Sequence, residues 1–111
     1  MSEELMGRFK EIFERAKEKL PEVGSWNKVY QFIVEDDGEF YVEISRGEAR
    51  IVEGRHESPI ATIQARREVL EKILSGELDA MKAFMTRQLR ITGNVFDTMN
   101  LKKIIDHGIK G

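Results

Sequence analysis

Apolar residues recur at helical spacing near the start of the chain. Residues 3–20 place them on one stripe, and acidic and basic residues in equal number occupy the rest of the surface. Glu3 and Glu4, next to Ser2, favour a helix start, and Pro21 ends the helix. We therefore predict a helix that covers a core rather than one that lies on a membrane surface, which favours a basic polar face. The stripe consists of Leu5, Phe9, Ile12, Phe13, Ala16 and Leu20.

From residue 27 the apolar period changes to two, which is typical of strands with one buried face. Residues 36–38 (Asp-Asp-Gly) and 46–47 (Arg-Gly) are turn sequences, and Pro59 suits the first position of a strand. Consecutive hairpins of this kind predict a mainly antiparallel sheet. The four predicted strands span residues 27–35, 39–45, 48–53 and 59–64. The apolar face of the first two strands carries Tyr30, Phe32, Val34, Phe40, Val42 and Ile44.

Helical spacing returns in the second half of the chain. Gly76 is a natural C-terminal cap for one helix, and Asp79 can cap a second, shorter one. Alternation over residues 88–92 predicts a fifth strand. Asn94 can cap a last helix, with Asp97 in a position like that of a capping box. The apolar residues at helical spacing are Val69, Leu70, Ile73 and Leu74, then Met81, Phe84 and Met85, then Val95, Phe96, Met99, Ile104 and Ile105.

The predicted order of elements is therefore helix, four strands, two helices, one strand and one helix. Each strand has one apolar face, which helices must cover. The 111 residues have the length of one domain, and 41% hydrophobic with 34% charged residues is an ordinary globular composition. We predict one α+β domain over residues 1–111, with a five-stranded, mainly antiparallel sheet covered on one face by helices.

The charge and the apolar runs argue against two kinds of partner. The 18 basic and 20 acidic residues are intermixed and the net charge is -2, so no basic field is present to hold a nucleic acid. No apolar run approaches the ~18–20 residues that a membrane span needs. The acidic N-terminus is unlike a secretory signal, and the C-terminus is unlike a peroxisomal address. We therefore expect a cytoplasmic protein without stable membrane insertion.

Few residues have the chemistry of an active site or a metal site. The chain has no cysteine, and His56 and His107 are far apart in sequence. It has no Gly-x-Ser-x-Gly elbow and no phosphate-binding glycine loop. The acidic residues at 36–39 lack the ligand spacing of a calcium loop and are interpreted as a hairpin turn. We expect no catalysis, no cofactor and no metal.

Methionine and phenylalanine are concentrated after residue 80. Met81, Met85 and Met99 join Phe84 and Phe96 there. Methionine is flexible and polarizable, so it suits the lining of a pocket for a flexible acyl chain. The same residues at the same spacing also suit a filled core, and spacing alone does not decide between the two.

The segment that contains these residues resembles a known family. Residues 76–94 read as Gly, a short helix with Ala-Phe, and a Leu-x-Ile-x-Gly strand and turn. This resembles the signature segment of the sterol carrier protein type-two family. The hairpin over residues 32–47 and the segment 59–74 are also similar to that family, so the likeness covers about residues 27–105. Arg87 departs from the pattern, because the family commonly has glycine there.

The resemblance implies a sheet and a layer of helices that enclose an apolar cavity. Members of the family bind sterols, fatty acids, fatty acyl-CoA and other lipids, with no metal and no catalysis of their own. By position, the residues expected to bind lipid are Phe32, Val34, Phe40, Val42 and Ile44 on the sheet and Met81, Phe84, Met85, Leu89, Ile91, Val95 and Met99 in the second half.

Our first hypothesis is a non-catalytic carrier of a fatty acid, a fatty acyl-CoA or a sterol-like molecule. It requires that the helices leave an apolar gap above the sheet, because binding is driven by apolar area removed from water. A basic residue at the mouth would hold an anionic head group, and the alternative for each is solvated surface charge. The candidates are Arg87, Arg90, Lys102 and Lys103.

Two other classes of function stay open. An isomerase-like enzyme in an α+β cup needs a buried acid or base, for which Asp79 and Asp97 are candidates, although both also suit helix caps. A protein-interaction or homodimerisation module would use the same apolar groove. Trp26 would then anchor the interface, or alternatively form a lid over the first helix.

Overall fold

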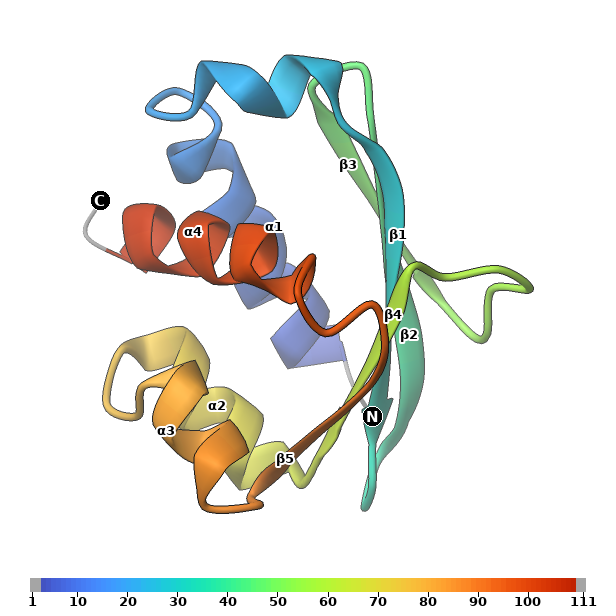
Figure 1. Cartoon of the computed structure of the whole chain (residues 1–111), viewed down its shortest axis with the longest axis vertical. Helices are drawn as coiled ribbons and strands as arrows, with labels where there is room; N and C mark the ends of the chain where they lie inside the picture. The colour runs from blue at the N-terminus through green and yellow to red at the C-terminus, as the bar shows by residue number, and fades with distance from the viewer. Residues whose placement is uncertain (1–2, 110–111) are drawn as a thin grey trace.

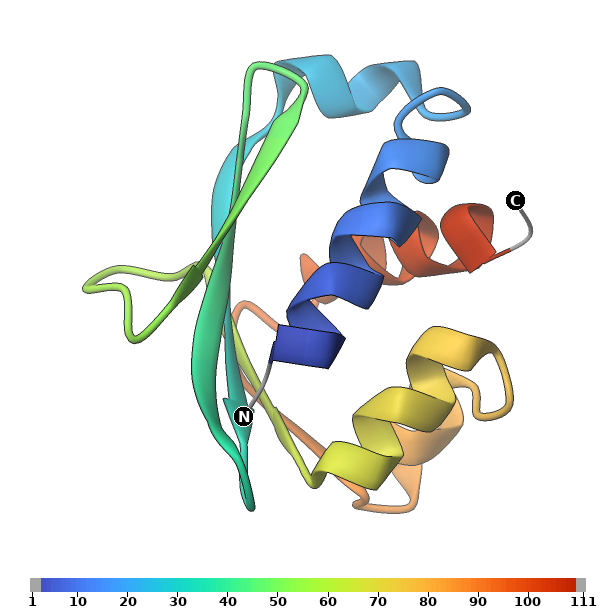
Figure 2. The ribbon, with the colours of Figure 1, turned by 180° about the vertical axis from the view of Figure 1, so that it is seen from behind.

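The computed structural model describes residues 3–109, in which a five-stranded sheet carries its helices on one face (Figure 1). Figure 2 shows the same two layers from behind. The predicted α+β architecture is confirmed. The elements are α1 (Glu3–Ala16), a short 3-10 helix η1 (Pro21–Ser25), β1 (Asn27–Val34), β2 (Gly38–Ser45), β3 (Glu48–Glu53), β4 (Ala61–Ala65), α2 (Arg67–Ser75), α3 (Ala80–Met85), β5 (Leu89–Gly93) and α4 (Thr98–Ile109).

The strands lie in the order β3-β2-β1-β4-β5. The pairs β1–β2, β2–β3 and β4–β5 are antiparallel, as the turn sequences predict, but β1 and β4 are parallel. The prediction that β4 continues a run of hairpins is therefore wrong. After β3 the chain leaves one edge of the sheet, crosses its outer face and pairs with the far side of β1 (Figure 1).

A buried glutamine holds this crossing segment on the outer face. Gln31 is 2% exposed, and its amide nitrogen donates to the carbonyl oxygens of Gly54 at 2.9 Å and Phe40 at 3.2 Å. The backbone N–H of His56 donates to the side-chain oxygen of Gln31 at 2.8 Å. The ring of His56 also meets Tyr41 edge-on. Because the Gln31 amide is satisfied, it is buried without the cost of an unpaired polar group.

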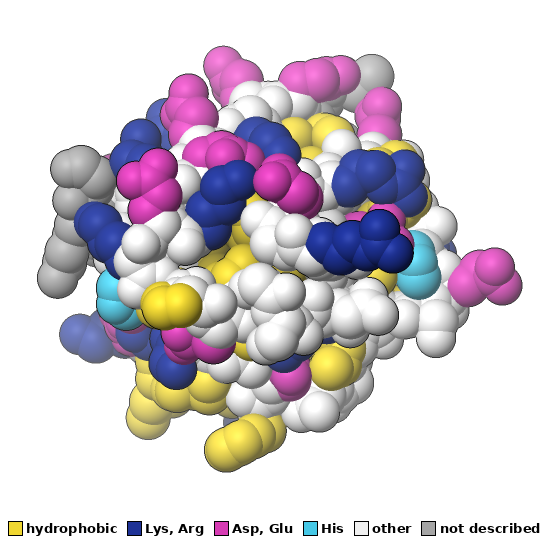
Figure 3. Space-filling view, turned by 90° about the horizontal axis from the view of Figure 1, so that it is seen from above, with side chains coloured by type: hydrophobic (Ala, Val, Ile, Leu, Met, Phe, Trp, Pro, Cys, Tyr) yellow, Lys and Arg dark blue, Asp and Glu magenta, His cyan; other side chains and the backbone are white. Residues whose placement is uncertain are grey.

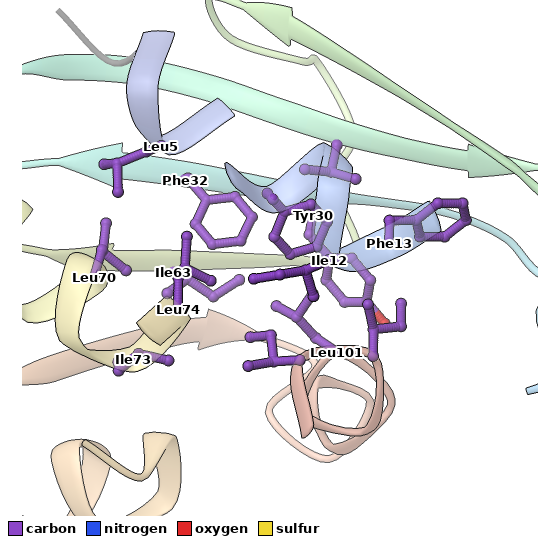
Figure 4. Close-up of a cluster of buried hydrophobic side chains, with 14 of the residues drawn as sticks. Leu5, Ile12, Phe13, Tyr30, Phe32, Ile63, Leu70, Ile73, Leu74 and Leu101 are labelled. Carbon is purple, nitrogen blue, oxygen red and sulfur yellow. The ribbon is translucent and has the colours of Figure 1, made fainter. Parts of the chain in front are cut away.

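The main core lies between the inner face of the sheet and the helices (Figure 4). The predicted inward faces of β1 and β2 are confirmed, since Tyr30, Phe32 and Val42 are buried there. The stripe of α1 is also buried as predicted, although the α-helix ends at Ala16 rather than Leu20. Ser2, expected at the helix start, lies outside the described residues.

Helices α1 and α4 cross at very short range. Gly108 of α4 faces the backbone of Ile12, and a Cβ atom at residue 108 would lie 2.1 Å from the Ile12 carbonyl oxygen. The side chain of Arg15 donates to the Gly108 carbonyl oxygen at 2.7 Å. Only glycine allows this approach, which fixes where α4 lies over the sheet.

Candidate functional site

A cavity of about 100 Å³ lies between the sheet and the helices, and it opens to the surface. It occupies the half of the molecule where α2, α3 and the start of α4 face β1, β4 and β5. In Figure 4, Leu70 and Leu74 of α2 and Phe32 and Ile63 of the sheet lie around this region. The lining residues are Leu5, Phe9, Phe32, Phe40, Ile63, Leu70, Ile73, Leu74, Ala80, Met81, Phe84, Leu89, Ile91, Val95, Thr98, Met99, Leu101, Lys102 and Ile105.

The chemistry of the lining is almost wholly apolar. Thr98 and Lys102 are the two lining residues that are not apolar. Phe32 stacks on Phe40 with ring centroids 4.9 Å apart, and Phe9 meets Phe32 at 5.9 Å. Such a surface offers burial to an apolar ligand and nearly no directional hydrogen bonds.

The mouth of the cavity is formed by exposed hydrophobic side chains. Met81, Val95 and Met99 line the cavity and are also exposed to solvent. Met85 and Phe96 lie on the neighbouring surface and are 74% and 85% exposed. Figure 3 shows hydrophobic side chains gathered at one edge of the molecule, whereas charged side chains cover much of the rest of that view. Unbranched methionines at an opening can change rotamer to admit a guest.

The structure brings eight of the twelve predicted lipid-binding residues to the cavity and places four elsewhere. Those eight are Phe32, Phe40, Met81, Phe84, Leu89, Ile91, Val95 and Met99. Val34, Val42 and Ile44 are buried on the predicted face but outside the lining, and Met85 points away from it at the surface. Strand periodicity indicates which face a residue occupies, not its position along the strand relative to the cavity. Helix α1 contacts β3, and η1 contacts β2, at the part of the sheet that the cavity does not reach.

Residues of α1, α2 and α4 complete the lining, and the sequence did not single them out as a site. Leu5, Leu70 and Leu101 are examples from the three helices. Their helical spacing predicted burial correctly. A residue that covers the core and a residue that lines a hollow within it have the same pattern, so no signal in one sequence separates them.

Lys102 is the one charged group in the lining, and two carboxylates hold it. Its ammonium lies 2.7 Å from Asp106 and 3.3 Å from Asp79. The hydrogen bond to Asp106, followed by the charges of both acids, raises the pKa of Lys102. Because two negative charges face one positive charge, this lysine is poorly placed to hold an anionic head group. Lys103 faces Glu22 at 3.4 Å, away from the cavity lining.

Asp97 adopts a different role from the predicted capping box. Asn94 does accept a hydrogen bond from the backbone N–H of Asp97 at 2.9 Å. The Asp97 carboxylate turns instead to β1, where it lies 3.0 Å from the Lys28 ammonium and accepts a hydrogen bond from the Tyr30 hydroxyl. Consequently α4 begins at Thr98, and residues 94–97 form a turn fastened to the sheet.

The acids proposed for an isomerase-like site therefore lie outside the cavity lining. Asp79 caps α3 as predicted, because it accepts the backbone N–H of Lys82 at 3.0 Å, and this bond lowers the pKa of Asp79. Trp26 is half-buried against the core, with the Lys28 ammonium 4.6 Å from its ring centroid. Within residues 3–109, no cluster of three or more His, Cys, Asp or Glu is placed to hold a metal ion.

Arg87 occupies the position where the resemblance expects glycine, and its backbone is left-handed with φ of 67°. It ends α3 in a Schellman motif. The Gln88 N–H donates to the Ala83 carbonyl at 2.8 Å, and the Arg87 N–H donates to the Phe84 carbonyl at 3.1 Å. The turn therefore keeps the geometry of a glycine cap with an arginine in it.

Comparison with known proteins places this architecture in a family. The SCP-2 sterol transfer family model matches residues 9–106. The chain therefore belongs to the SCP-2 sterol transfer family, as its signature segment predicts. A search of curated protein sequences found no match.

Solved structures share the fold at low sequence identity. The sterol carrier protein domain 2 of Helicoverpa armigera has a TM-score of 0.73 at 24% identity, over 99% of this chain and 89% of that one. Palmitated SCP2L2 from Aedes aegypti has a TM-score of 0.64 at 19% identity, over 88% and 94%. The inverting sec-alkylsulfatase Pisa1 from Pseudomonas sp. has a TM-score of 0.67 at 13% identity, over 78% of this chain but 14% of that enzyme. The fold thus occurs both as a small protein and as part of an enzyme.

No helix within residues 3–109 is both long enough and apolar enough to cross a bilayer.

Proposed function

We propose that this protein is a non-catalytic carrier that holds the acyl chain of a fatty acid or a fatty acyl-CoA in the apolar cavity. The observation that carries the proposal is a hollow lined by apolar side chains except at Thr98 and Lys102, which reaches the surface between Met81, Val95 and Met99. Membership of a sterol transfer family and the palmitated state of the Aedes aegypti relative support a lipid as the guest.

The volume of the cavity favours a flexible chain over a rigid ring system. About 100 Å³ is small beside the ~300–1,000 Å³ typical of small-molecule sites. A chain can enter one methylene at a time while Met81 and Met99 move aside, whereas a sterol nucleus needs its full width at once. We expect each buried methylene to contribute about 0.8 kcal/mol.

The head group is expected to stay at the mouth, outside the cavity. The open rim fits either a carboxylate or the much larger CoA moiety, because neither has to be enclosed. Lys102 is already held by Asp79 and Asp106, so it does not provide the anchor. The lack of an acid in the lining supports a carrier rather than an isomerase-like enzyme.

Titration with NBD-labelled stearate tests the proposal, using two variants of one strand. Ile91 lines the cavity, and its neighbour Thr92 is exposed outside the lining. Ile91→Trp fills the hollow and is expected to weaken binding at least tenfold. Thr92→Trp adds the same side chain outside the hollow and is expected to change binding less than twofold.

Competition then identifies the lipid class. Palmitate and palmitoyl-CoA are expected to displace the probe at micromolar concentration, and cholesterol is expected to do so only weakly. Circular dichroism must show that both variants are folded. Failure of the wild-type chain to bind the probe at micromolar levels, or equal binding by the two tryptophan variants, would contradict the proposal.

A further inference from the structure

The surface around the cavity mouth combines exposed hydrophobic side chains with unpaired positive charge. We call the mouth patch the five exposed apolar residues of this surface. Phe96 is 85% and Met85 is 74% exposed, and neither lines the cavity, so solvent rather than the cavity is their present neighbour. Exposed large hydrophobics that cluster in this way mark an interaction site. The mouth patch consists of Met81, Met85, Val95, Phe96 and Met99.

The charge of the same segment is opposite in sign to that of the whole chain. Residues 80–96 contain three basic residues and no acidic one, which gives +3, whereas the chain carries -2, so the remaining residues carry -5. Lys82, Arg87 and Arg90 are exposed, and none of them forms an ion pair with another residue of the described range 3–109. The two acids that flank the segment, Asp79 and Asp97, each lie beside a lysine from another element.

We infer that the mouth patch docks on an anionic lipid surface and that Lys82, Arg87 and Arg90 hold it there. Apolar side chains that enter the interface, beside basic residues that meet the head groups, are the two features of a peripheral membrane contact. The inference deepens the proposed function, since it names the partner from which the same cavity receives its lipid.

Charge decides against the other occupants of this surface. A second copy docked patch to patch would bring two segments of +3 together, which like-charge repulsion opposes. A partner groove would have to receive Phe96, which lies on the turn of residues 94–97 rather than on a helix face. A fluid lipid surface accepts such a protruding ring without a shaped pocket.

Docking is tested by flotation of the full chain with vesicles of phosphatidylcholine containing 30% phosphatidylserine. Each basic residue near an anionic surface contributes about fivefold to binding. We therefore expect Lys82→Gln/Arg87→Gln/Arg90→Gln to weaken vesicle binding on the order of 100-fold. Met85→Ser/Phe96→Ser is expected to weaken it at least tenfold. Vesicles of phosphatidylcholine alone, or 0.5 M salt, are expected to remove most of the binding.

A matched control removes the same charge elsewhere. Arg8, Arg46 and Lys72 are exposed residues of α1, of the β2–β3 turn and of α2. Arg8→Gln/Arg46→Gln/Lys72→Gln is expected to change vesicle binding less than threefold. Equal losses in the two triple variants would overturn the inference, because net charge rather than this surface would then decide binding.

Two readouts separate this inference from the proposed function. The Met85→Ser/Phe96→Ser variant keeps the cavity lining, so it is expected to bind NBD-labelled stearate in micelle-free buffer like the wild type. Stearate binding without vesicle binding would overturn the docking inference alone. Vesicle binding without stearate binding would overturn the proposed function alone. A dimer that the Met85→Ser/Phe96→Ser variant abolishes, or binding to poly-L-glutamate but not to vesicles, would assign the surface to a protein partner and overturn the docking inference.

Discussion

The hydroxyl of Tyr30 donates a hydrogen bond to the carboxylate of Asp97, 67 residues further along the chain. This bond joins the central strand β1 to the turn that carries Val95 and Phe96 at the cavity mouth. Burial, and then the hydrogen bond to Asp97, raise the pKa of the Tyr30 phenol well above its usual value. The geometry of the mouth therefore depends on a protonated tyrosine.

Stability is expected to fall steeply in alkali because of Tyr30. A phenol in the unfolded chain loses its proton near pH ~10, whereas the folded state keeps the Tyr30 proton to higher pH. Above pH ~10 the folded state thus binds more protons than the unfolded state, so the free energy of unfolding decreases as the pH rises, by up to about 1.4 kcal/mol per pH unit. Below that pH the contribution is fully present.

Urea unfolding of the wild type and of Tyr30→Phe between pH 8 and 11 measures this effect. The phenylalanine variant is expected to be less stable at pH 8, and the difference between the two proteins is expected to shrink as the pH rises. A difference that stays constant across this range would contradict the assignment.

Asp97→Asn is expected to destabilise the fold by about 1–3 kcal/mol, the range for hydrogen bonds to charged groups. The substitution leaves the Lys28 ammonium, whose side chain is 13% exposed, without its counter-charge. Loss of this contact also frees residues 94–97 from β1. Chemical denaturation measures the stability, and hydrogen exchange at Asp97 and Thr98 reports the loosening of the turn. Lys28→Met/Asp97→Asn is expected to be less destabilised than the sum of the two single variants, because the pair is removed together.

The faces of the strands were predictable, but the order of the strands was not. Alternation is a local property, so it indicated correctly that Phe32 and Phe40 face the helices. The parallel pairing of β4 with β1 depends on the loop that Gln31 holds across the outer face. A single glutamine between apolar neighbours has the same pattern as an ordinary solvent-facing strand residue, so nothing in the sequence indicates its burial.

The same distinction explains the candidate site. The Met- and Phe-rich segment identified Met81, Phe84 and Met99 as lining residues, since they lie close together along the chain. The contact of Asp97 with Lys28 joins segments 69 residues apart, and local capping rules suggested a different partner for Asp97. Position along a strand and contacts between distant segments require the folded chain.

Two alanine substitutions at helical glycines are expected to have opposite effects. Gly7 of α1 borders open space, where an added Cβ atom would meet no neighbouring group within 4 Å, so Gly7→Ala is expected to stabilise the protein by about 0.5–1 kcal/mol through helix propensity. Gly108→Ala places a Cβ atom 2.1 Å from the Ile12 carbonyl oxygen and must push α1 and α4 apart. We expect it to cost about 3 kcal/mol or more, as overpacking does. Thermal unfolding compares both, and a neutral Gly108→Ala would show that the two helices are free to separate.

Arg87→Gly is expected to stabilise the chain by about 0.5–1 kcal/mol. A left-handed residue other than glycine costs roughly 1–2 kcal/mol, and the greater freedom of glycine in the unfolded state offsets part of the gain. The Schellman hydrogen bonds of Ala83 and Phe84 do not use the Arg87 side chain, so they survive the change. Arg87→Ala keeps the strained backbone and serves as the control, with an expected change below about 0.5 kcal/mol. If Arg87 is retained for its charge at the mouth patch, Arg87→Gly and Arg87→Ala should lose vesicle binding equally, although only the first gains stability in urea. Equal stability of the two variants would show that the turn carries no strain for glycine to relieve.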